Sequence, residues 1–251
     1  MKKIILLILI GLLTVFVLTG CNAIVPGEGE GEGEGEPEPV KTTVLMEAFI
    51  AVACSQCAKI EPIIENLAME YSRDEMILVE LVPWGSNYDL RESYQRMTNL
   101  YKLETKIPQL TFNGLNGNLL GATGATYSTI KSRIEAQLAL TPAIKLTATK
   151  TNQNYTTMIT GTVKNISSNT LSNLVVNGMI IKDMGQTGFH YVVTDIFEDE
   201  KVIISSIAPG EEKSFTITVT DSKWTSSSDG VIFVQSTSDP KKTIKQSIFL
   251  D

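Results

Sequence analysis

Residues Val44 to Pro62 read VLMEAFIAVACSQCAKIEP, and this stretch decides how the rest of the chain is interpreted. It begins with an apolar run typical of a buried strand, reaches Cys54-Ser55-Gln56-Cys57, and continues as a helix-like segment. A strand followed by two cysteines at this spacing is typical of a redox-active dithiol. The partial positive charge at a helix N-terminus favours a thiolate, so we expect Cys54 to be the nucleophile and Cys57 the resolving cysteine.

The segments that follow alternate between strands and helices as far as Thr141-Pro142. A strand, a helix and a second strand in this order predict a right-handed crossover and a parallel pair. The expected strands are 42–49, 76–82, 107–113 and 118–121, and the expected helices are 55–71, 89–103 and 127–140.

Helical periodicity disappears after residue 142. Eight short apolar runs alternate there with clusters of Asn, Ser, Gly and Asp, which predicts an all-β sandwich over residues 143–251. Two turn-like motifs, Gly161-Thr162-Val163-Lys164-Asn165 and Ala208-Pro209-Gly210-Glu211, resemble those of immunoglobulin-like modules on bacterial surfaces.

Three features of residues 42–141 together resemble thioredoxin. They are Cys54-x-x-Cys57, Pro62 five positions after the second cysteine, and Ile107-Pro108 opening a later strand. The resemblance implies a cis peptide bond before Pro108 and a catalytic place for Pro108 beside the dithiol, with the backbone of Ile107 free to pair with a substrate strand. The expected fold class is therefore an α/β thioredoxin-like domain followed by an all-β immunoglobulin-like sandwich domain.

The chain also departs from the thioredoxin pattern. Ala53 replaces the usual tryptophan, Ser55-Gln56 replaces Gly-Pro, and Ala48 stands where thioredoxin has a buried acid. These departures weaken the transfer of a strongly reducing potential. The pattern of Glu47 and Phe49 before the dithiol is closer to a divergent group of exported thioredoxin-fold lipoproteins.

Three further residues are candidates for the site. Glu47 and Glu80 fall on neighbouring expected strands, where either could relay a proton during exchange or be solvated at a strand end. Glu47 should point to the sheet face opposite Ala48. Trp84 follows the second parallel strand, so it could line the groove beside Cys54 and bind substrate, or serve only in packing.

The N-terminus has the pattern of an exported lipoprotein. Lys2 and Lys3 precede an apolar stretch that is too short to span a membrane, and Leu18-Thr19-Gly20-Cys21 resembles the bacterial lipobox. We therefore expect residues 1–20 to be a signal peptide and Cys21 to carry the lipid. Residues 21–41, rich in Gly-Glu repeats, form an acidic and extended linker. This predicts an extracytoplasmic protein, lipid-anchored to a bacterial membrane.

Charge and residue counts exclude some partners. Without Lys2 and Lys3, the 21 basic residues fall to 19 against 28 acidic ones, and no basic block appears, which argues against nucleic acid. A zinc or copper site lacks ligands, since His190 is the only histidine and is expected in a sandwich strand. No metal or other cofactor is expected.

These features predict thiol–disulfide exchange on exported proteins through Cys54 and Cys57. The partners would be protein thiols or disulfides, a membrane redox partner, and the membrane itself through Cys21. The alternative is a non-catalytic cell-surface binding lipoprotein in which Cys54–Cys57 is a structural disulfide.

Overall fold

A computed structural model describes residues 39–153, 155–185, 188–220, 224 and 228–251 of the 251-residue chain. The expected signal peptide, Cys21, and all but the last three residues of the expected linker lie outside the described residues. Within the part of the chain that the structure describes, no helix is both long and apolar enough to cross a membrane.

Two fully buried strands lie at the centre of the first half. Strands β1 (Val44–Phe49) and β2 (Met76–Leu81) are parallel, as expected, and α1 (Cys57–Glu70) connects them. Burial on both faces explains why both strands are almost continuously apolar in sequence. On the other side of β1 lies the antiparallel β3 (Gln109–Phe112), which pairs with β4 (Leu119–Leu120) before α3 (Tyr127–Leu138).

The helix expected over residues 89–103 is shorter and divided. It consists of α2 (Arg91–Gln95) and a π-helical turn, η1 (Arg96–Leu100), in which the Tyr101 N–H donates to the Arg96 carbonyl over 3.0 Å. A π-turn of this kind is frequent at functional sites.

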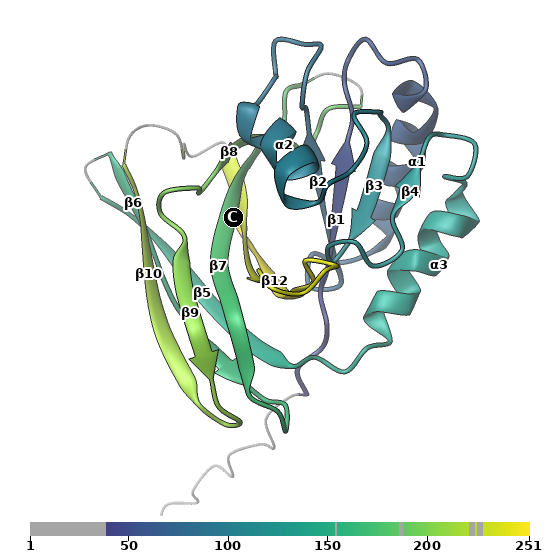
Figure 1. Ribbon diagram of the computed structural model, residues 1–251. Helices are drawn as coiled ribbons and strands as arrows, with labels where there is room; N and C mark the ends of the chain where they lie inside the picture. Colours follow the sequence, from purple (N-terminus) through teal and green to yellow (C-terminus); the bar gives the residue numbers. More distant parts are fainter. Residues whose placement is uncertain (1–38, 154, 186–187, 221–223, 225–227) are drawn as a thin grey trace, which may run out of the picture. The chain divides into compact units, whose positions relative to one another are not determined.

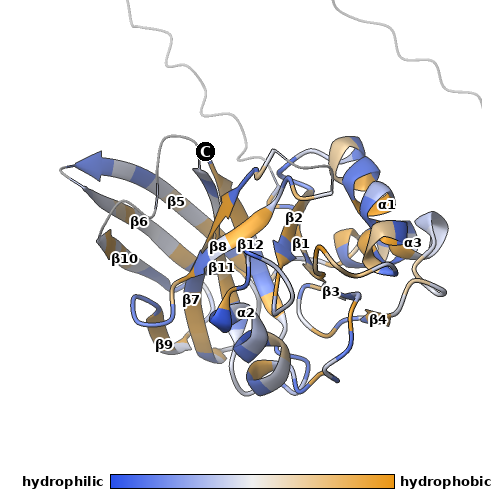
Figure 2. Ribbon diagram, turned by 90° about the horizontal axis from the view of Figure 1, so that it is seen from above, coloured by the Kyte–Doolittle hydropathy of each residue, from blue (hydrophilic) through white to orange (hydrophobic). Residues whose placement is uncertain are grey.

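The described residues of the second half form strands and no helix, and these strands pair with their neighbours in that half in antiparallel fashion. They are β5 (Ile144–Gln153), β6 (Thr156–Asn165), β7 (Leu171–Lys182), β8 (Val192–Ile196), β9 (Val202–Ile207), β10 (Glu212–Thr220), β11 (Ser228–Ser236) and β12 (Ile244–Leu250). Strands β5, β6 and β10 form a three-stranded sheet, and along them hydrophobic and hydrophilic residues alternate (Figure 2).

The fold class expected from the sequence is wrong. Strands of both halves join one nine-stranded mixed sheet in the order β12-β11-β7-β8-β2-β1-β3-β4, with β9 paired to β7 (Figure 1). The joining contact is the parallel pairing of β2 with β8, where Glu80 lies opposite Val192. Residues Pro39–Asp251 accordingly form one compact unit, mainly of strands, and not an α/β thioredoxin-like domain followed by a separate immunoglobulin-like sandwich. Local periodicity predicts strands but does not predict which distant strand pairs with an exposed edge.

Three hydrophobic cores hold this unit together. The first core lies on the α1 and α3 side of the sheet and includes Cys57. The second core fills the space between the three-stranded sheet and β7, β9, β11 and β12. The third core lies under α2 and η1, and it joins Leu45 and Ile77 of the first half to Met179 and Phe233 of the second. Because the third core is shared, the two halves bury apolar surface against each other.

Candidate functional site

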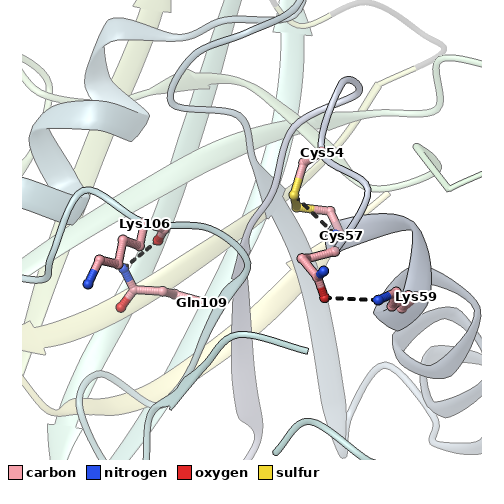
Figure 3. Close-up of a disulfide and its surroundings, with 6 residues drawn as sticks. Cys54, Cys57, Lys59, Lys106 and Gln109 are labelled. Carbon is pink, nitrogen blue, oxygen red and sulfur yellow. Dashed lines mark hydrogen bonds between the residues drawn. A yellow bond between two sulfur atoms is a disulfide. The ribbon is translucent and has the colours of Figure 1, made fainter. Parts of the chain in front are cut away.

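Cys54 and Cys57 are joined by a disulfide at the start of α1 (Figure 3). Their Cα atoms are 5.2 Å apart. Cys57 is fully buried in the first core, whereas Cys54 is partly exposed and packs against the edge of that core. The Cys57 N–H points at the Cys54 sulfur over 3.1 Å. A backbone donor and a helix N-terminus at this position favour a thiolate on Cys54 after reduction.

The chain around Cys54 leaves its sulfur open to a partner. Ala53, Ser55 and Gln56 are exposed, and Val52 is 47% exposed, an unusually high fraction for a valine next to a core. Cys54 is therefore more accessible from solvent than Cys57, which is fully buried.

The Ile107–Pro108 peptide bond is cis, as the resemblance implied. Phe49 at the end of β1 pairs with Gln109 at the start of β3, so the loop carrying Cys54 and the Ile107–Pro108 bond lie at the same end of the sheet. Pro108 is buried, and Ile107 is partly exposed and packs against the first core, as Cys54 does. The side-chain amide of Gln109 stabilises this loop by donating to the carbonyl of Lys106 (Figure 3) and to the carbonyl of Glu104.

Glu80 is a buried carboxyl group on the first-core face of β2. The Tyr191 N–H donates to its Oε2 over 2.9 Å, while its Oε1 has no hydrogen-bond partner among the described residues. Burial raises the pKa of Glu80 to about 8, against the hydrogen bond from Tyr191, and the nearby carboxylates of Glu65, Glu61 and Asp183 raise it further. Glu80 is therefore largely protonated at neutral pH and can exchange a proton in the range where thiols titrate.

The loop between β7 and β8 reaches across to α1. The His190 Nε2 lies 3.8 Å from Glu65 Oε1 on α1, and its Nδ1 lies 3.0 Å from Asp183 Oδ1. Phe189 is buried in the first core. The expectation that His190 belongs to a sandwich strand is wrong, because it lies in this loop beside the dithiol helix.

Glu61 adds a second perturbed carboxyl group one helical turn after Cys57. Partial burial and the neighbouring Glu65 raise the pKa of Glu61 to about 7. Glu61 and Glu65 on α1 and Glu80 on β2 are thus three acids from two elements, close enough for the carboxylates of Glu61 and Glu65 to raise the pKa of Glu80. Sequence reasoning missed Glu61 and Glu65 because acids on an amphipathic helix ordinarily face solvent.

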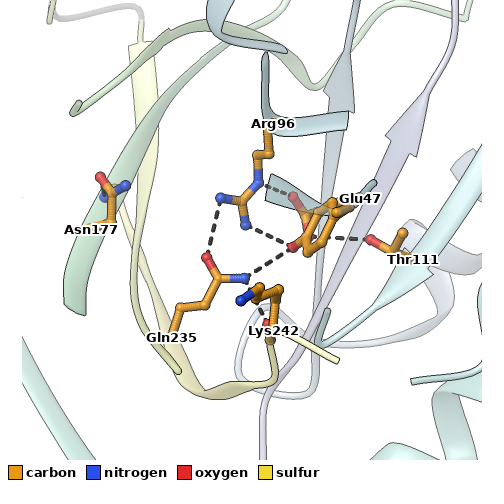
Figure 4. A network of polar contacts seen from close by, with 8 residues as sticks. Glu47, Arg96, Thr111, Asn177, Gln235 and Lys242 are labelled. Atoms are coloured by element: carbon orange, nitrogen blue, oxygen red, sulfur yellow. Dashed lines mark hydrogen bonds and ion pairs between the residues drawn. The ribbon is translucent and has the colours of Figure 1, made fainter. Parts of the chain in front are cut away.

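Glu47 is on the opposite face of β1 from the dithiol. It is buried and bonds to the Arg96 guanidinium, the Tyr101 hydroxyl and the Thr111 hydroxyl (Figure 4). The alternation of β1, with Ala48 in the first core and Phe49 in the third, explains this placement. Glu47 is therefore not positioned to relay a proton to the dithiol, and Glu80 remains as the candidate.

Trp84 packs on the third core and makes an edge contact with Tyr94, with ring centroids 6.0 Å apart, whereas Cys54 packs against the first core. A place for Trp84 in a substrate groove stays a prediction. Within the described ranges, no group of three or more His, Cys, Asp or Glu side chains is arranged to hold a metal ion.

Solved structures share this fold at low sequence identity. HBP35 of Porphyromonas gingivalis aligns with a TM-score of 0.64 and 16% identity, over 83% of this chain and 74% of that one. Protein AGR_C_4864 of Agrobacterium tumefaciens aligns with a TM-score of 0.55 and 13% identity, over 84% of this chain and 94% of that one.

No protein-family model matches the chain, and no curated protein matches it. The two structural alignments extend over both halves of the unit, which agrees with the continuous sheet and with the correction of the expected fold class. At these identities they show a common fold and nothing about activity.

Proposed function

We propose that the protein is an extracytoplasmic, membrane-anchored thiol–disulfide oxidoreductase that acts on exported proteins. The observation that carries the proposal is the asymmetry of the dithiol: Cys54 is partly exposed at a helix N-terminus and Cys57 is fully buried behind it. The motif resemblance of Cys54-x-x-Cys57, Pro62 and Ile107-Pro108 to thioredoxin supports the same chemistry.

The exchange proceeds in two displacements. The Cys54 thiolate attacks one sulfur of a substrate disulfide, forming a mixed disulfide and releasing the other substrate sulfur as a thiolate. Cys57 then loses its proton, attacks the Cys54 sulfur and releases the second substrate thiolate. Two electrons pass from the dithiol to the substrate, and the reverse sequence oxidises a substrate dithiol. The direction is set by the potential of the membrane redox partner.

Glu80 supports the second displacement as a proton carrier. It lies on the first-core face that also buries Cys57, and its pKa of about 8 is close to that of a thiol. In its ionised form Glu80 accepts the proton that Cys57 loses, because its raised pKa makes it a stronger base than an ordinary carboxylate, whose pKa is about 4.3. Its free Oε1 leaves one oxygen available for this transfer.

The membrane location is proposed from the leader alone. Leu18-Thr19-Gly20-Cys21 supports lipidation of Cys21, and the Gly-Glu repeats support an extended spacer between the lipid and the described unit. The proposed partners are therefore exported protein thiols or disulfides near a bacterial membrane, reached without a metal or other cofactor.

A matched pair of cysteine variants tests the exchange mechanism. Cys57→Ala keeps the attacking thiol and removes the resolving one, so it should accumulate mixed disulfides with exported proteins. Cys54→Ala keeps only the buried thiol and should accumulate almost none. Both variants are compared by non-reducing gel electrophoresis after thiol blocking, together with insulin reduction and peptide oxidation by the wild-type chain.

The proposal fails if neither variant traps a partner and the wild-type pair neither reduces insulin nor oxidises a dithiol peptide. A reduction potential below about −300 mV would point instead to a structural disulfide, and hence to a binding lipoprotein.

A further inference from the structure

A pocket opens on the face of the sheet opposite the first core. The α2–η1 segment covers Met179 of β7, but the same face of β7 continues past η1 to Asn177 and Val175. There a pocket of about 610 Å³ lies between η1 and strands β7, β9 and β11. We call it the η1 pocket. Its volume is within the range of about 300–1,000 Å³ typical of ligand sites.

A fixed polar network forms the floor of the η1 pocket. Arg96, the first residue of η1, bonds to Glu47 and donates to Gln235 Oε1 over 3.2 Å (Figure 4). Gln235 in turn donates to the Lys242 carbonyl over 2.7 Å. The network neutralises the Arg96 charge and holds both side chains in one arrangement, so the floor is preorganised.

The side-chain amide of Asn177 provides a hydrogen-bond donor at the floor of the pocket. Its side chain is only 5% exposed, and its Oδ1 accepts from the Gly178 N–H over 2.7 Å. Its amide nitrogen donates to no other described residue, and Figure 4 shows it apart from the bonded network. Because this donor lines the pocket, the position favours a ligand that brings an acceptor.

The remaining wall combines aliphatic and uncharged polar side chains and carries no net charge. Val175 and Ile203 are paired across β7 and β9, and Ile203 is 74% exposed. At the rim, Lys201 and Glu198 neutralise each other in an ion pair of 2.9 Å. No side chain lining the pocket is aromatic. An anion would find no free cation here, and a flat ring would find nothing to stack on.

We propose that the η1 pocket binds a short, uncharged, extended peptide segment. A peptide carbonyl accepts from the Asn177 amide, and an aliphatic side chain of the same segment covers Val175 and Ile203. Side chains of an extended segment alternate in direction, so one segment can meet the polar floor and the aliphatic side chains of the wall together. The site is independent of the dithiol and stands whether or not Cys54 and Cys57 exchange electrons.

The test uses the full mature chain and a mixture of N-acetylated, C-amidated pentapeptides made from Ala, Val, Leu, Ser and Thr. Binding is followed by calorimetry and by the side-chain amide signals of Asn177 and Gln235 in ¹H–¹⁵N spectra. Neighbouring serines of β9 give a matched pair, because Ser205 lines the pocket and Ser206 does not, and both are exposed.

Ser205→Trp should fill the pocket and weaken binding about ten-fold or more, while Ser206→Trp should leave it unchanged. Asn177→Asp keeps the acceptor for Gly178 but removes the free donor, and it should weaken binding as well. Absence of binding to the wild-type chain, or equal binding by the two tryptophan variants, overturns the site. Equal or tighter binding of lysine- or aspartate-containing pentapeptides, or of the neutral trisaccharide maltotriose, overturns the ligand class.

Discussion

Replacing Glu80 by glutamine should remove a large part of the loss of stability that the protein suffers as pH rises. Glu80 has a folded-state pKa of about 8 and an ordinary value of 4.5, so between these values the folded state holds a proton that the unfolded state has released. Stability therefore falls with increasing pH across this window and is level above it. At 1.36 kcal/mol per pH unit, Glu80 alone should cost the wild-type chain about 3 kcal/mol between pH 5 and pH 8.

The Glu80→Gln variant should match the wild type near pH 5 and exceed it by about 3 kcal/mol near pH 8, because glutamine is neutral and can still accept from Tyr191. Guanidinium unfolding, followed by circular dichroism with the disulfide kept oxidised, measures both slopes. Glu212→Gln makes the same charge change at an exposed position on β10 and is the control. Equal pH slopes in wild type and Glu80→Gln, or a Glu80 carboxyl ¹³C signal that titrates near 4.5, would refute the reasoning.

Three other predictions concern the ion pair, the sheet and the anchor. Arg96→Met should destabilise the chain by about 3–5 kcal/mol, since it leaves Glu47 buried and unpaired, whereas Lys106→Met at an exposed pair should cost under about 1 kcal/mol in the same unfolding assay. A fragment of residues 42–141 should aggregate or lack a cooperative unfolding transition, because it frees the β2 edge and removes half of the third core; cooperative unfolding would contradict the continuous sheet. Cys21→Ser should move the protein from the membrane to the soluble fraction, and continued membrane retention would contradict lipidation.

Much of the local structure could be predicted because it depends on neighbours in sequence. The apolar runs of β1 and β2, the strands after residue 142 and the cis bond before Pro108 all follow from period, turn residues and motif. The split of the expected helix over residues 89–103 could not be predicted, since the fixed position of Arg96 over Glu47 depends on packing against the sheet.

The prediction of two separate domains was wrong because it did not foresee that β8 of the second half lies beside β2. An edge carries unpaired backbone groups, and nothing in a local pattern says whether water or a strand 112 residues away, as Val192 is from Glu80, will satisfy them. Here the Glu80 N–H donates to the Tyr191 carbonyl, and the Tyr191 N–H donates to the Glu80 carboxyl group. This pairing joins strands of both halves in the nine-stranded sheet, and the β7–β8 loop that carries Tyr191 contacts α1 through His190.

The sequence by itself determined the dithiol: two cysteines after a strand, with Pro62 and Ile107-Pro108 at their positions, predict where a nucleophilic sulfur would lie. Only the tertiary structure decided which of the two strand glutamates lies on the same face of the sheet as the dithiol. Glu47 and Glu80 are equivalent in sequence, each an isolated acid within an apolar strand, but alternation and pairing put one against Arg96 and the other beside α1. The physical reason is that burial and neighbouring charge, which set a pKa, are properties of the folded contacts and not of the residue type.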